Sequence, residues 1–202
     1  MQAHLRAGAA VYNAGHYHAA HDAWEERWLS LPDGDRKDAL QGLIQFTAAV
    51  YHVTQDNPEG AAGLAESATD YVDGAGESFE GVALGPVREG LAAVAADPED
   101  PGESFPPPIT FEGIEPSLAD LGFEATVIAA PVLAEALGYD EAVFEQAAEY
   151  AREDVDERGR SPFVSLLFDF VREPESRGIA AQRLGEHVGR REQRESDVDG
   201  LF

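Results

Sequence analysis

The stretch HYHAAHDAWEERW, residues 16–28, gathers side chains that can bind metal ions or transfer protons. It holds three of the six histidines of the chain and both tryptophans. Imidazole and carboxylate groups one helical turn apart can bind a divalent metal ion or perform acid–base chemistry. His21 and Glu25 have this spacing, and His18 and Asp22 repeat it. The stretch is therefore the first candidate for a functional site.

Helical periodicity separates the polar and apolar residues of this stretch. Counted from His18 at about 100° per residue, Asp22, Glu25 and His21 fall between about 300° and 40° and form one polar stripe. His21, at about 300°, lies at the edge of this stripe. The apolar residues occupy the arc from about 200° to 280°, the side that should pack in a core: Tyr17, Ala20, Trp24, Trp28 and Leu31.

A second polar stripe is predicted on residues 37–55. This segment is apolar on most faces, which predicts a buried central helix. Gln41, Gln45 and His52 fall together at about 100° to 140° from Leu40, with the small Ala48 beside them. An unpaired buried polar group costs about 1 to 3 kcal/mol, so these side chains need polar partners. We therefore expect His21 and Glu25 within hydrogen-bond reach of this group.

The ordered motifs YNAGHYHAAHDAWEERW, LQGLIQFTAAVYH and DNPEGAAGL resemble the family known as domain of unknown function 309. The family is all-helical and has no established biochemical activity. The resemblance covers roughly the first 75 residues. Asp22 stands where the family more often has glutamate, which shortens that carboxylate. The resemblance implies these site residues, in chain order: Tyr17 or His18, His21, Asp22, Glu25, Gln41, Gly42, Gln45, His52, Asn57, Gly60 and Ala61.

Several functions are compatible with these residues. The favoured interpretation is a buried polar cluster that fixes the helix register or binds a small polar ligand. A divalent metal ion held by His21 and Glu25, with His18, Asp22 or His52 completing its shell, is an alternative. A metal-dependent hydrolytic enzyme is another. A further alternative is acid–base chemistry by His21, with Glu25 orienting it and the glutamines binding a polar substrate. No nucleophile or oxyanion hole is evident, so the sequence does not decide whether the protein is an enzyme.

A protein-interaction module is the alternative from a different class. The stretch YNAGHYHAAHDAW has the Gly, Tyr and Ala spacing of a tetratricopeptide helical hairpin. An array of such hairpins repeats about every 34 residues. The corresponding stretch AVYHVTQDNPEGAA does not repeat the pattern, so at most one hairpin of this kind is predicted.

Apolar residues recur at helical spacing nearly throughout, which predicts an all-α fold: a compact multi-helix bundle with a helical C-terminal extension. Residues 98–117 carry six of the twelve prolines and show no helical period. We interpret them as a linker or an extended segment over the core. The expected organisation is a helical family domain at 1–97, this segment, and a helical extension at 118–202 packed on the first part.

The charge of the chain limits its partners. Asp and Glu number 39 against 14 Lys and Arg, a net charge of -25, and Lys37 is the only lysine. Such a surface repels nucleic acid and anionic membranes, so neither is expected as a partner. A small polar ligand and a homo-oligomer stay open. Arg190, Arg191 and Arg194 form the one basic cluster, and we expect them in solvent near a helix terminus.

The same composition indicates where the protein works. An acidic surface almost without lysine is typical of proteins from salt-saturated cytoplasm, because salt screens the repulsion there. We therefore interpret the source as a halophile. The absence of cysteine excludes disulfides and thiolate chemistry. The N-terminus lacks an apolar segment of signal-peptide length, so a soluble, cytoplasmic protein is expected.

Folding should depend on salt, because an excess of 25 negative charges must crowd on the surface. We expect the midpoint of thermal unfolding to rise along a potassium chloride series. Equal or higher stability at low salt would contradict the halophile interpretation.

Overall fold

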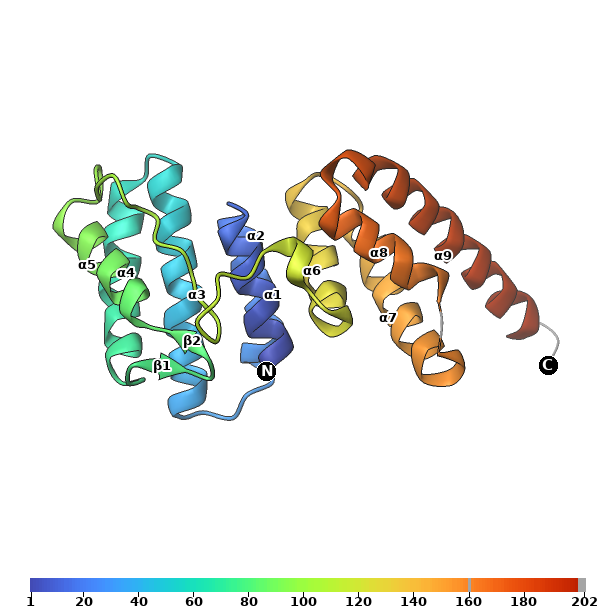
Figure 1. The fold of residues 1–202 in the computed structure, drawn as a ribbon, viewed down its shortest axis with the longest axis horizontal. Helices are drawn as coiled ribbons and strands as arrows, with labels where there is room; N and C mark the ends of the chain where they lie inside the picture. Colours follow the sequence, from blue (N-terminus) through green and yellow to red (C-terminus); the bar gives the residue numbers. More distant parts are fainter. Residues whose placement is uncertain (160, 200–202) are drawn as a thin grey trace. The chain divides into compact units, whose positions relative to one another are not determined.

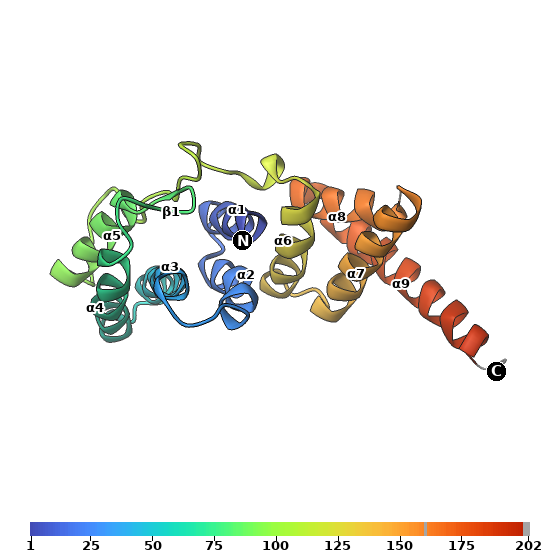
Figure 2. The same cartoon turned by 90° about the horizontal axis from the view of Figure 1, so that it is seen from below.

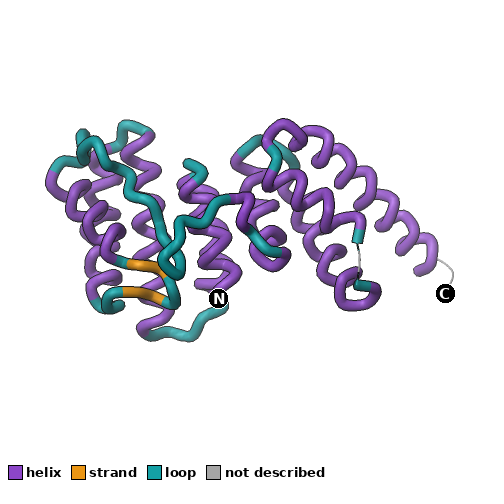
Figure 3. Tube along the Cα trace, viewed as in Figure 1, coloured by secondary structure: helices purple, strands orange, loops and turns teal. Residues whose placement is uncertain are grey.

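A computed structural model describes residues 1–159 and 161–199, so residues 160 and 200–202 of the predicted extension lie outside it. Within the described residues, nine α-helices dominate and one two-stranded sheet is present (Figure 1; Figure 3). The prediction of an all-α bundle is confirmed. The chain divides into two compact units, Met1–Asp120 and a second that begins at Leu121.

The first unit contains five α-helices. They are α1 (Gln2–Asn13), α2 (Tyr17–Leu29), α3 (Asp35–Thr54), α4 (Pro58–Asp73) and α5 (Gly85–Ala96). Viewed almost end-on in Figure 2, α2, α3 and α4 lie side by side, with α1 next to α2 and α5 next to α4. α3 packs against α2, α4 and α5. It is therefore the central helix that its apolar residues predict.

Trp24 fixes α2 against α1. Its side chain is fully buried, and its indole nitrogen donates a hydrogen bond to the His4 carbonyl oxygen at 2.9 Å. Gly8 of α1 makes room for the indole, because a Cβ atom there would lie 2.1 Å from that nitrogen. The rings of Tyr12 and Tyr17 meet edge to face 5.1 Å apart. The apolar side of α2 therefore packs on α1, and its polar stripe is turned away.

The proline-rich segment belongs to the first unit. The Asn13 side chain donates to the Ile109 carbonyl oxygen and accepts from the Ile109 amide, both at 2.9 Å. Tyr12 donates its hydroxyl to the Pro107 carbonyl oxygen at 3.0 Å. Ile109 and Phe111 are buried. Residues 98–117 include this extended segment, which lies against α1.

A small β element contains two copies of a Phe-Glu-Gly turn. β1 (Ser78–Phe79) pairs with β2 (Val82–Ala83) across Glu80 and Gly81, which both have positive φ. Glu112 and Gly113 repeat this conformation, and isolated bridges join Phe111 to Val82 and to Ile114. The Glu80 and Glu112 carboxylates pair with Arg36 and Arg6 respectively. Strands of two residues have no alternation to detect, so periodicity did not predict them.

The second unit is also helical. It contains α6 (Phe123–Ala136), α7 (Glu141–Arg158), α8 (Pro162–Arg172) and α9 (Arg177–Asp199). Two short 3-10 helices, Leu118–Asp120 and Pro174–Ser176, precede α6 and α9. Its core includes the rings of Phe144 and Phe170, 4.3 Å apart. None of the described helices is both long enough and apolar enough to span a membrane.

Arg191 corrects the expectation that the basic cluster lies in solvent. Its guanidinium pairs with Glu153, Asp154 and Glu195 and lies 3.9 Å from the centre of the Tyr150 ring. These contacts join α9 to α7. Burial, and then the hydrogen bond to Glu195, raise the pKa of Tyr150 to about 12. The expectation failed for Arg191 because its carboxylate partners on α7 are remote in sequence, whereas Arg190 and Arg194 are exposed.

Gly8→Ala should destabilise the first unit, because the new methyl group would collide with the buried Trp24 indole. Overpacking of this kind costs about 1 to 3 kcal/mol. Gly63→Ala is the matched control, since nothing lies within 4 Å of a Cβ atom there. Alanine in an exposed helix interior should stabilise by about 0.5 to 1 kcal/mol. Urea unfolding of both variants measures this, and equal effects would contradict the packing argument.

Candidate functional site

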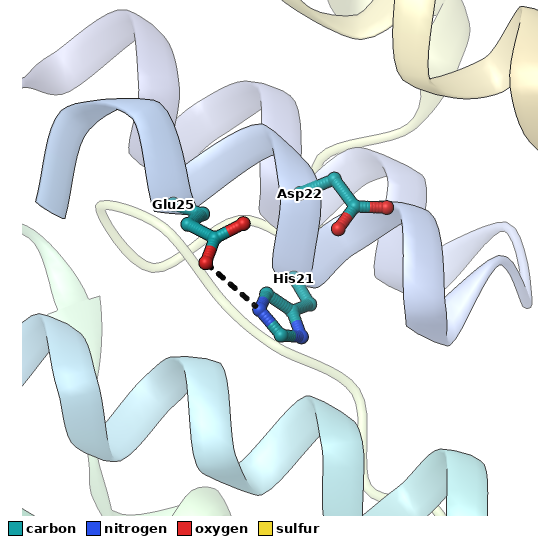
Figure 4. Close-up of side chains that lie close together, drawn as sticks. All are labelled: His21, Asp22 and Glu25. Atoms are coloured by element: carbon teal, nitrogen blue, oxygen red, sulfur yellow. Dashed lines mark ion pairs between the residues drawn. The ribbon is translucent and has the colours of Figure 1, made fainter. Parts of the chain in front are cut away.

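His21, Asp22 and Glu25 lie together on α2 (Figure 4). Each offers one ligand atom, and the three atoms lie within 4.8 Å of one another. His21 Nε2 and Glu25 Oε1 are 4.0 Å apart, an ion-pair distance. The side chains of His21 and Glu25 are 29% and 51% exposed, so a dissolved ion can reach them. The helix itself makes this cluster, because Glu25 follows His21 by four residues and Asp22 by three, and both spacings bring side chains together on a helix.

His18 connects this cluster to α3. Its Nδ1 atom lies 3.1 Å from Asp22 Oδ2, and its ring stacks on that of His21 at 5.8 Å. The His18 ring also meets Tyr51 of α3 edge to face at 5.3 Å. His18 therefore orients the Asp22 carboxylate and marks where α2 touches α3.

A second contact fixes the register of α2 against α3. Lys37 Nζ lies 4.7 Å from the centre of the Trp28 ring. His18, near the start of α2, contacts Tyr51, near the end of α3, whereas Trp28, near the end of α2, contacts Lys37, near the start of α3. The two helices are therefore antiparallel, and the residues between these two pairs face each other. His21 and Glu25 thus lie opposite the part of α3 that carries Gln41 and Ala48. We call this set the α2–α3 face: His18, His21, Glu25 and Trp28 with Lys37, Gln41, Ala48 and Tyr51.

The glutamines of α3 do not bond to the histidine cluster. Among the described residues, no hydrogen bond joins His21 or Glu25 to Gln41, Gln45 or His52. Gln45 Oε1 is buried without a hydrogen-bond partner. The expected direct hydrogen bonds between the two stripes are therefore absent. The helices meet instead through two ring contacts, His18 with Tyr51 and Lys37 with Trp28.

His52 bonds to the start of α4 instead. Asn57 caps this helix, with its Oδ1 atom accepting from the Gly60 amide at 3.1 Å. Its Nδ2 atom lies 2.9 Å from His52 Nδ1. A Cβ atom on Gly60 would lie 2.7 Å from Asn57 Nδ2, so glycine is needed for this arrangement. The third motif thus holds His52, and its Ala61 is buried.

Two further residues implied by the family resemblance have packing roles. A Cβ atom on Gly42 would lie 2.7 Å from Val72 Cγ2, so this glycine allows α3 and α4 to approach closely. Tyr17 packs on Tyr12, and burial raises the pKa of both phenols above the ordinary value. Neither Gly42 nor Tyr17 belongs to the cluster on α2.

Two members of the α2–α3 face, Tyr51 and Lys37, were not predicted as site residues. Tyr51 lies in the segment predicted to form a buried helix, yet it is half-buried and touches His18. Lys37 was noted only for its rarity. Lys37 lies one helical turn before Gln41 and on the same side of the helix as Ala48. This spacing could have identified Lys37 as a member of the polar stripe.

The fold and the cluster define a small helical unit with imidazole and carboxylate groups on its second helix. The family model described as "Domain of unknown function (DUF309)" matches residues 5–64, which contain the whole α2–α3 face. This agrees with the resemblance that the motifs predict.

One curated relative is an "Uncharacterized protein" of Aquifex aeolicus (strain VF5). It is 26% identical over 95 residues, which make up 47% of this chain and 28% of that protein. The alignment therefore covers little more than a quarter of the relative. No solved structure matches the chain.

The tautomer of His52 follows from the cap. Because Asn57 Oδ1 accepts from Gly60, its Nδ2 must donate to His52 Nδ1, so Nε2 carries the proton of the neutral ring. We expect long-range ¹H–¹⁵N NMR spectra to show the Nε2–H form. Asn57→Asp keeps the cap acceptor but removes the donor, so it should shift the ring toward the Nδ1–H form. An unchanged tautomer in that variant would contradict the assignment.

Proposed function

We propose that the protein binds a divalent metal ion on α2 through His21, Asp22 and Glu25. The observation that supports this most is the convergence of three ligand atoms within 4.8 Å. One imidazole and two carboxylates suit zinc, manganese or iron better than calcium, which prefers oxygen ligands alone. Modest side-chain rotations would bring the three atoms to coordination distance.

The surroundings of the cluster support binding. The bond from His18 to Asp22 holds one ligand in place, as a second layer of contacts does in metal sites. The net charge of -25 attracts cations to the surface. Three protein ligands leave coordination positions for water or a ligand, which is typical of reactive rather than purely structural metal sites. A metal-bound water would then allow hydrolytic chemistry.

A second candidate function is binding of a small polar ligand without metal. Gln45 Oε1 favours it, because a buried acceptor without a partner is costly and an N–H group of a ligand would satisfy it.

The net charge of -25 further supports our inference that the protein works in a salt-rich cytoplasm and does not bind nucleic acid.

Titration of the purified, untagged chain with Mn²⁺ or Zn²⁺ tests the metal proposal. We expect one ion per chain by calorimetry. Glu25→Gln should weaken binding by about tenfold or more, because it removes a charged ligand. Glu26→Gln is the matched control: it removes the same charge from the neighbouring, exposed residue of α2. No binding by the unaltered chain, or equal losses in both variants, would contradict the proposal.

A further inference from the structure

Lys37 is the only lysine among the 14 basic residues of the chain, and it lies on the α2–α3 face. Its side chain is 21% exposed, and its ammonium group lies 4.7 Å from the centre of the Trp28 ring. The ammonium also pairs with Asp33 at 3.1 Å, but that carboxylate is 97% exposed. Such exposed surface pairs contribute little to stability. An aromatic ring thus holds Lys37 in place, and replacing its anionic partner costs little free energy.

Gln41 and Ala48 extend the same side of α3. At about 100° per residue, both lie within about 40° of Lys37. The contacts of Trp28 with Lys37 and of His18 with Tyr51 place this side opposite His21 and Glu25. Ala48 contributes only a methyl group, whereas Ile44, which lies on the same side between Gln41 and Ala48, is buried. The amide of Gln41 makes no hydrogen bond to another described residue, so its N–H groups can bind a ligand.

We infer that the α2–α3 face binds a small oxyanion, a carboxylate or phosphate group, between the metal ion and the side chains of Gln41 and Lys37. This inference rests on the proposed metal site. An open metal position, an amide N–H and an ammonium group are three partners of positive character. An anion has few such places on a chain with a net charge of -25. A neutral ligand would gain little from the ammonium group.

The neighbouring cation serves as a control. Arg36 has the same charge as Lys37, but its guanidinium binds Glu80 at the β1–β2 turn at 2.6 Å. It therefore takes no part in the α2–α3 face. Lys37→Met keeps an apolar stem on Trp28 and removes the charge, whereas Arg36→Met removes an equal charge one residue away.

Calorimetric titrations with Mn²⁺, in the presence and absence of inorganic phosphate or acetate, test the inference on the full chain. Binding of metal and anion to one site must be coupled. We expect phosphate, acetate or both to tighten Mn²⁺ binding by about tenfold in the unaltered chain and in Arg36→Met. Lys37→Met should lose this tightening but bind Mn²⁺ alone about as well as Arg36→Met does. Circular dichroism checks that both variants are folded.

Each outcome decides the inference. Tightening by phosphate alone assigns a phosphate group, and tightening by acetate alone assigns a carboxylate. If Mn²⁺ binds but neither anion affects it, or if Lys37→Met keeps the tightening, the oxyanion site is wrong while the metal site stands. If Mn²⁺ does not bind to the unaltered chain, the proposed function and this inference both fail.

Discussion

The contact between the Trp24 indole and Gly8 is the constraint on which the arrangement of the first unit depends. The indole fills the space that a side chain at position 8 would occupy and bonds to the His4 carbonyl oxygen. This fixes the rotation of α2, because its apolar side has one place to pack. The polar residues of α2 then turn toward the edge of α3. The placement of these polar residues thus results from a packing requirement in the core.

The α2–α3 face combines groups of opposite character along two antiparallel helices. α2 contributes two imidazoles and a carboxylate, whereas α3 contributes an ammonium group, an amide and a methyl group. Ring contacts at both ends hold the helices in register, His18 with Tyr51 and Trp28 with Lys37. These contacts need no buried ion pair, whose desolvation is costly. Between these two ring contacts, the side chains of His21 and Glu25 stay partly exposed, so their nitrogen and oxygen atoms are accessible to a bound ion.

Local features of the molecule could be predicted from sequence, and contacts between distant segments could not. Periodicity predicts the helices, and it predicts that His21 and Glu25 share one side of α2, because a single helix determines that geometry. The partner of His18 depends on the length of the 30–34 turn and on the rotation of α2, so Tyr51 was missed. The Phe-Glu-Gly turns were missed because β1 and β2 are too short to show a period. The partners of Arg191 were missed because Glu153 and Asp154 lie 38 and 37 residues away.

The central claim is that the packing of α2 presents His21, Asp22 and Glu25 together as a metal site. Anomalous diffraction from crystals grown with Mn²⁺ tests it most directly, because the signal locates the ion without assumptions about its ligands. The account predicts one strong peak at about 2.0 to 2.3 Å from a nitrogen of His21 and from oxygens of both carboxylates. Strong peaks only at other acidic residues, or no ordered peak, would contradict it.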